Sequence, residues 1–261
     1  MFEERTLTGG LAEVGDAYAP DALVLDCQRD FETLDPAVAE ELLLLTETVD
    51  PLDYDPDWVP EDAPEELREF VDADFTVGLP GDGGVAWTTQ TEPPCVFVKP
   101  RLETSPEAFV DFLIAEALVE VSLGEPEQFL GFFGARYPEF AATAGQRLDP
   151  AGTYQLAVAL YDAYLGLQTR RAFETWADDY PALHDSWADA GRRLDPRLSD
   201  LSTELARGQT TFPAAAELAC SAVKHGRDLP APFAALDTDA YRRHGADYAI
   251  RWTAKTFDAL E

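Results

Sequence analysis

The feature that most constrains this chain is its charge. Its 261 residues include 50 Asp and Glu against 19 Lys and Arg, which gives a formal net charge of −31. Most of these carboxylates must lie on the surface, where they repel one another and weaken the compact state at low ionic strength. Because the Debye length falls to about 3 Å at 1 M salt, we expect the chain to require molar salt for stability.

The same charge excludes several kinds of partner. Nucleic-acid phosphates and anionic lipids repel a surface this negative, so binding to nucleic acid or to a membrane is not expected. A nucleic-acid site would have to rest on three isolated pairs, Arg170-Arg171, Arg192-Arg193 and Arg242-Arg243. The N-terminus lacks the pattern of a signal peptide, and no apolar run is long enough to cross a bilayer. The sequence therefore predicts a cytoplasmic protein.

The composition also resembles that of a known group of proteins. Apolar residues make up 46% of the chain, enough for a folded core. The 19 basic residues divide into 3 lysines and 16 arginines, and the chain has 3 cysteines and 1 methionine. An acidic, arginine-favouring chain poor in Lys, Cys and Met resembles the proteins of salt-in haloarchaea, and is similar to the uncharacterised families restricted to them. This resemblance spans the whole chain and implies a habitat, not an activity.

The charge is distributed unevenly along the chain. Residues 1–130 carry 32 acidic and 5 basic side chains, a net of −27, whereas residues 131–261 carry 18 and 14, a net of −4. We expect acidic N-terminal helices and a β-meander in residues 1–103. A helical region, residues 104–261, would pack on them, either as a second domain or as part of a single one.

Residues 75–99 form the predicted β region. They contain three segments rich in β-branched and aromatic residues, separated by Gly and Pro turns: Phe75–Leu79, Val85–Thr91 and Cys95–Lys99. The first 48 residues and the chain beyond residue 104 carry mostly helix signals, such as Pro106 before and Gly124 after one apolar segment. The sequence therefore predicts a mostly α (α+β) fold, a helical array with one small three-stranded antiparallel β-meander.

The helix predicted over Ser105–Leu123 carries the candidate site. It is apolar almost all round, which predicts burial, and it places Glu116 and Glu120 on one side at an i, i+4 spacing. Two carboxylates in a dry site would share a proton or recruit a cation. The preceding strand ends at Lys99 and Arg101, so an ion cluster of these four residues is a candidate. The alternative is that both glutamates are solvated or held in ordinary salt bridges.

The surrounding motif faintly resembles the active helix of zinc peptidases. The sequence Ala115-Glu116-Ala117-Leu118-Val119 follows a predicted strand, as that helix does. Ala115 and Val119 stand where the two histidine ligands would be required, so the resemblance implies that zinc peptidase activity is lost.

Other patterns favour structural roles. The isolated cysteines Cys27, Cys95 and Cys220 predict buried hydrophobic positions without disulfides. Three aspartates at alternate positions from residue 53 lack the glycine and glutamate of a calcium loop. We therefore predict no metal and no cofactor. A row at i, i+4 steps predicts ion pairing along one helix surface: Asp239, Arg243, Asp247 and Arg251.

Two functions remain open. The leading hypothesis is a non-catalytic protein that binds a protein partner or a second copy through its helical C-terminal half, where like-charge repulsion is weakest. The alternative is an enzyme or small-ligand binder that uses Glu116 and Glu120 in a cleft between meander and helices. Lys99 or Arg101 would then supply the electrophilic partner.

Overall fold

A computed structural model describes residues 1–34, 36–72, 75–79 and 83–259. Helices account for 62% of these residues and strands for 8%. The chain forms two compact units, each built from segments that are distant in sequence. Unit 1 comprises Met1–Asp53, Asp72–Glu127 and Ala172–Trp187. Unit 2 comprises Tyr54–Val71, Gln128–Arg171 and Ala188–Glu261. A division of the chain at residue 103 stays a prediction.

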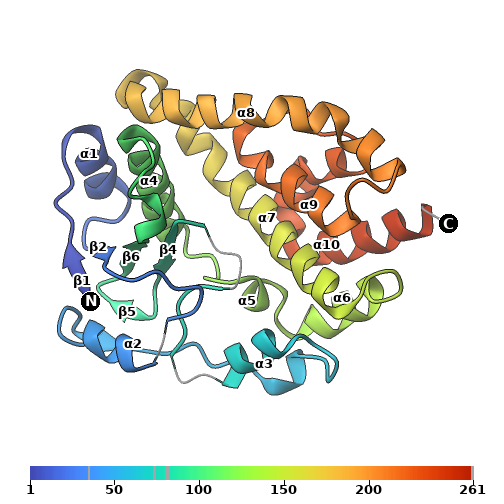
Figure 1. The fold of residues 1–261 in the computed structure, drawn as a ribbon, viewed down its shortest axis with the longest axis horizontal. Helices are drawn as coiled ribbons and strands as arrows, with labels where there is room; N and C mark the ends of the chain where they lie inside the picture. Colours follow the sequence, from blue (N-terminus) through green and yellow to red (C-terminus); the bar gives the residue numbers. More distant parts are fainter. Residues whose placement is uncertain (35, 73–74, 80–82, 260–261) are drawn as a thin grey trace. The chain divides into compact units, whose positions relative to one another are not determined.

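The strands of unit 1 overturn the predicted three-stranded antiparallel meander. They form a four-stranded mixed sheet in the order β1-β2-β6-β4 (Figure 1). Its members are β1 (Phe2–Glu4), β2 (Leu23–Cys27), β6 (Cys95–Val98) and β4 (Val85–Thr88). β2 and β6 pair in parallel, whereas the two outer pairings are antiparallel. A separate two-stranded sheet joins β3 (Thr48–Val49) to β5 (Thr91–Glu92).

The prediction was wrong because the central pairing is long-range. β2 is a short apolar run, which periodicity cannot distinguish from a buried helical segment. Its partner β6 follows some 70 residues later, and no pattern in the residues near either strand indicates that the two pair in parallel. Phe75–Leu79 has the composition of a strand but forms none. Its backbone instead accepts isolated hydrogen bonds, such as that from Leu34 N to Val77 O at 3.0 Å.

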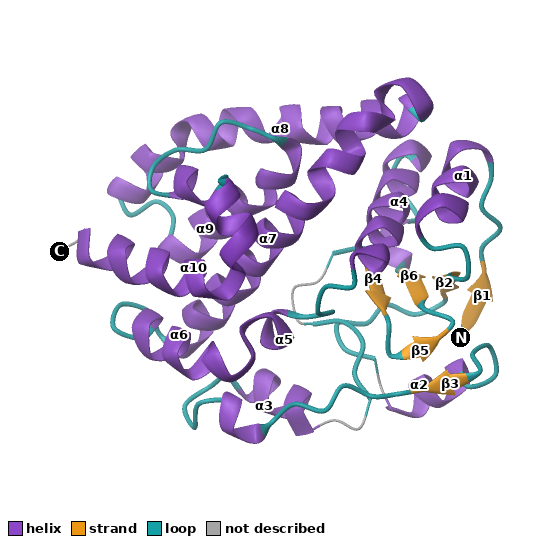
Figure 2. Ribbon diagram, turned by 180° about the vertical axis from the view of Figure 1, so that it is seen from behind, coloured by secondary structure: helices purple, strands orange, loops and turns teal. Residues whose placement is uncertain are grey.

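Helices and loops cover both faces of the four-stranded sheet. α1 (Gly9–Tyr18) and α4 (Glu107–Leu123) pack on each other, and α4 contacts β4 and β6. Figures 1 and 2 show both helices on one side of the strands and α2 (Pro36–Leu42) on the other. On the α2 side, Leu25 and Phe97 pack with Leu34, Leu42 and the chain around residue 77. The short η2 (Pro100–Leu102) links β6 to α4.

Unit 2 is helical in its described part. It holds η1 (Pro56–Trp58), most of α3 (Glu65–Asp72), α5 (Phe129–Phe133), η3 (Gly134–Arg136), α6 (Tyr137–Ala144), α9 (Phe212–Ser221), η4 (Val223–His225), η5 (Phe233–Leu236) and α10 (Asp239–Ala259). The long helices α7 (Pro150–Asp179) and α8 (Pro181–Ala206) contribute residues to both units. No helix among the described residues is long and apolar enough to span a bilayer.

Several helix boundaries follow the sequence signals. α4 ends before Gly124, whose φ of 66° is left-handed. Asp149-Pro150 is a typical helix start, an aspartate followed by a proline at the first helical position, and α7 begins at Pro150. Asp195-Pro196 has the same sequence form, but no helix begins there, because α8 continues through Pro196. A helix can pass a proline when the rest of its length is held by packing.

Candidate functional site

The predicted carboxylate pair lies on α4 in unit 1. Glu116 is 6% exposed, in agreement with a helix that is apolar almost all round. Glu120, one turn later, is half-buried and accepts a 2.8 Å hydrogen bond from the Trp87 indole nitrogen on β4. Neither glutamate lies in bulk solvent.

Lys99 is the most deeply buried charged residue of the candidate cluster, at 1% exposed. Its ammonium nitrogen lies 4.6 Å from the centre of the Phe31 ring, in cation–π geometry. Such burial of a lysine is rare without compensating interactions. The ion cluster of Lys99 and Arg101 with Glu116 and Glu120 stays a prediction.

Arg101 lies on the surface of unit 1 and holds two carboxylates. Its guanidinium is 2.7 Å from Asp30 and 2.7 Å from Glu32. The hydrogen bond from Arg101 lowers the pKa of the Asp30 carboxyl below its ordinary value. One arginine thus neutralises part of a local excess of negative charge.

The described residues show neither a metal-binding group nor a reactive thiol. Within the described residues, no group of three or more His, Cys, Asp or Glu side chains could hold a metal ion. In the acidic stretch from residue 53, Asp55 accepts a 3.0 Å hydrogen bond from the Asp57 backbone and so caps η1. The three cysteines are buried, and burial raises the pKa of Cys27 to about 12. A neutral, buried thiol is a poor nucleophile.

Unit 2 contains a cluster that sequence reasoning missed. Arg171 on α7 and Arg242 and Arg243 on α10 all lie within electrostatic reach of the Asp239 carboxylate. We call Arg171, Arg242, Arg243 and Asp239 the arginine patch. Arg242 donates a 3.0 Å hydrogen bond to Asp239, and this contact lowers the pKa of the Asp239 carboxyl. Two of the arginine pairs that are isolated in the sequence are therefore neighbours in the fold.

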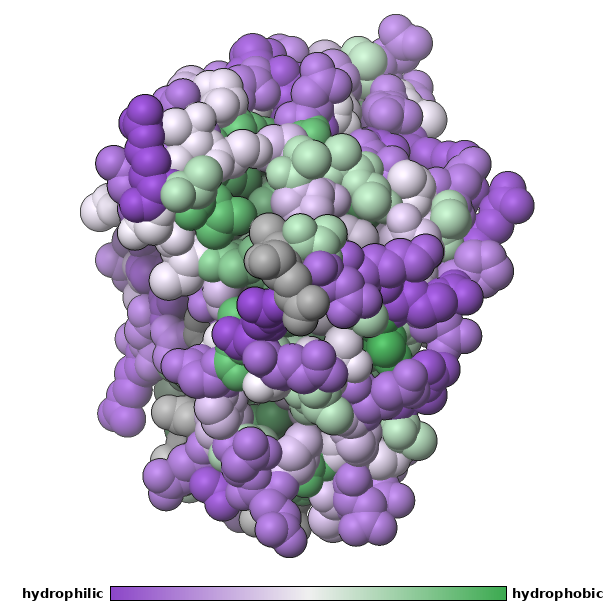
Figure 3. Space-filling model, turned by 90° about the vertical axis from the view of Figure 1, so that its right-hand side faces the viewer, coloured by the Kyte–Doolittle hydropathy of each residue, from purple (hydrophilic) through white to green (hydrophobic). Residues whose placement is uncertain are grey.

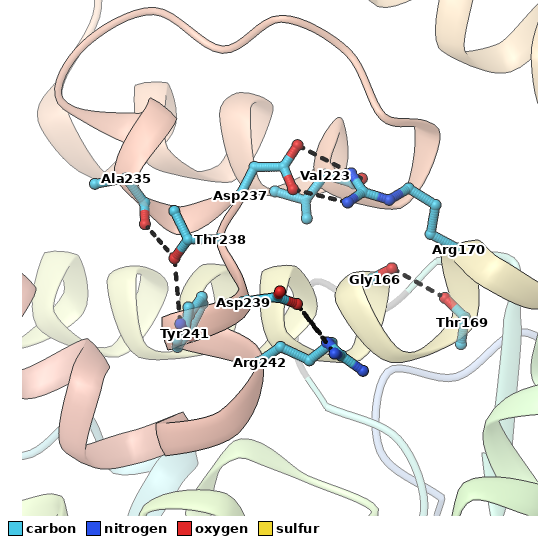
Figure 4. Close-up of polar contacts among 10 residues, drawn as sticks. All are labelled: Gly166, Thr169, Arg170, Val223, Ala235, Asp237, Thr238, Asp239, Tyr241 and Arg242. Carbon is cyan, nitrogen blue, oxygen red and sulfur yellow. Dashed lines mark hydrogen bonds and ion pairs between the residues drawn. The ribbon is translucent and has the colours of Figure 1, made fainter.

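The chain that leads into α10 is fixed against α7 (Figure 4). Arg170 forms two parallel 2.9 Å contacts with the Asp237 carboxylate and a 3.2 Å hydrogen bond to Val223 O. Bidentate pairing of this kind is strong and geometrically specific. The Thr238 hydroxyl accepts a hydrogen bond from Tyr241 N and so caps the first turn of α10. The arginine patch is thus built on ordered backbone.

The ion-pair row predicted along α10 does not form as expected. α10 is kinked at Gly245, where φ is 42° and ψ is −124°. Asp239 pairs with Arg242, and Asp247, beyond the kink, pairs with Arg136. An i, i+4 row requires a straight helix, and the kink interrupts the row between Arg243 and Asp247.

The kink leaves the patch with excess positive charge. Arg171 and Arg243 are exposed, and neither forms an ion pair with the residues that the structure describes. The sequence signals that could have located the patch are the two Arg-Arg pairs and the glycine in the middle of α10. Neither signal shows by itself that α7 and α10 bring the pairs together.

Unit 1 carries a different unusual surface feature. Leu43, Leu44 and Leu45, which follow α2, are 55%, 86% and 41% exposed. Three consecutive exposed leucines are uncommon on a monomeric protein surface. By contrast, the face drawn in Figure 3 is mostly hydrophilic, with apolar side chains in separate groups.

Comparison with known proteins identifies the family without assigning a role to any residue. No curated protein and no solved structure matches the chain. One family of unknown function, DUF7089, matches residues 1–260. Because that match covers nearly the whole sequence, the chain belongs to the DUF7089 family.

Proposed function

We propose that this chain is a non-catalytic interaction protein that binds an acidic protein surface through the arginine patch. The observation that carries the proposal is the pair of exposed arginines, Arg171 and Arg243, that lack an ion pair among the described residues. Carboxylates outnumber basic side chains 50 to 19 in this chain, so local carboxylate partners are abundant. Exposed arginines without such partners are therefore suited to an acidic surface on another molecule.

A second copy of the chain is the partner to which we commit. Its residues 1–130 carry a net charge of −27 (5 − 32), which supplies an acidic surface. Guanidinium groups bind carboxylates through directed, bidentate hydrogen bonds. Short contacts of this kind persist when long-range fields are screened, whereas the repulsion between two copies of charge −31 does not. Association should therefore be stronger near 1 M KCl than near 0.1 M.

Light scattering after size exclusion tests this proposal. The wild type should form a dimer or larger species at about 1 M KCl, and Arg171→Glu/Arg243→Glu should remain monomeric. The matched control is Arg192→Glu/Arg193→Glu on α8, which changes the charge equally at two exposed arginines that Asp189 already holds. A strictly monomeric wild type at both salt concentrations would reject the proposal. So would a double mutant that still associates while Leu44→Glu does not, because docking would then occur at the leucine run.

The composition supports the further proposal that the protein works in a cytoplasm of molar salt. Screening relieves the mutual repulsion of surface carboxylates and stabilises the folded state. The unfolding temperature should rise by at least about 10 °C between 0.1 M and 2 M KCl, and an unchanged value would reject the proposal.

The burial of Lys99 and Glu116 favours a second candidate function, a small-ligand or catalytic site with Glu120 nearby. Charged groups held for function commonly reduce the stability of the free protein. Glu116→Gln, which keeps the shape and removes the charge, should then raise the unfolding temperature. If Glu116 served only in a structural ion pair, the same change would leave a buried charge uncompensated and lower it.

A further inference from the structure

We draw no further inference here: the strongest candidate, the surface patch of exposed leucines Leu43, Leu44 and Leu45 that follows α2 in unit 1, carries no proposal, because nothing among the described residues shows what covers it.

Discussion

Arg101 in unit 1 and the arginine patch in unit 2 combine charges in opposite proportions. Arg101 holds two carboxylates, Asp30 and Glu32. In the patch, three guanidinium groups lie within electrostatic reach of one carboxylate, that of Asp239. A chain with 50 acidic and 19 basic residues makes the first arrangement common and the second improbable. In so acidic a protein, a local excess of arginine is therefore better evidence for a partner than a local excess of carboxylate.

The largest expected effect on the unfolding free energy comes from Gly245→Ala, a substitution at the kink that separates Arg243 from Asp247. The residue has a positive φ of 42°, and an added Cβ would lie 3.1 Å from the Phe132 ring. Strain of this kind costs about 2 kcal/mol, which urea denaturation would detect. As a control, Gly10→Ala in α1 meets only ordinary contacts, and it should be neutral or stabilising. Equal effects of the two changes would show that the kink is not required.

Removing Arg101 tests the arrangement in unit 1, in which one arginine binds two carboxylates. Arg101→Ala leaves Asp30 and Glu32 close together without a cation and should cost about 1 kcal/mol of unfolding free energy, because the group is half-exposed and screened. Arg29→Ala, an exposed neighbour without an ion pair among the described residues, is the control and should change the free energy by less than about 0.5 kcal/mol.

The contribution of Arg101 should also depend on pH. Because Arg101 lowers the pKa of Asp30 in the folded state, the stabilisation is fully present above the unfolded value of about 4. It is lost as the pH falls through the lowered folded value. The stability difference between wild type and Arg101→Ala should therefore vanish toward about pH 2. A difference that persisted there would point to lost packing by the arginine stem.

The arginines of the patch should behave differently from Arg101. Arg171→Ala and Arg243→Ala break no ion pair with the described residues, so each should change the unfolding free energy by less than about 0.5 kcal/mol. Chemical denaturation of both variants beside Arg101→Ala measures the contrast directly. A loss comparable to that of Arg101→Ala would show that the two arginines serve the fold, and the case for a partner would fail.

The smallest effect is a shift in the titration of Asp239. Arg242→Gln removes the main cause of its lowered pKa, so the pKa should rise toward its ordinary value. Arg243→Gln should raise it less, because Arg243 acts through space alone. Carboxyl-carbon NMR titration distinguishes them. If Arg243→Gln raised the pKa of Asp239 more than Arg242→Gln does, Arg243 would be the main partner of Asp239, as the i, i+4 pairing predicted from the sequence requires.

Local signals in the sequence predicted several features of the fold and site. Gly124 and Pro150 mark helix ends because capping depends on a few neighbouring residues. The apolar circumference of α4 predicted a helix buried on most sides but left open whether Glu116 is buried or solvated, and the structure places Glu116 at 6% exposed. The parallel pairing of β2 with β6 and the neighbourhood of Arg171 and Arg243 could not be predicted, because each joins segments about 70 residues apart.

The sequence by itself determined the charge of this protein, the family to which it belongs and the positions where many helices begin and end. Those properties depend on composition or on interactions over a few residues. Only the tertiary structure decided which strands pair and which arginines lie near the Asp239 carboxylate. Packing brings distant segments together, and a single kink at Gly245 redirects an ion pair that periodicity alone would have placed.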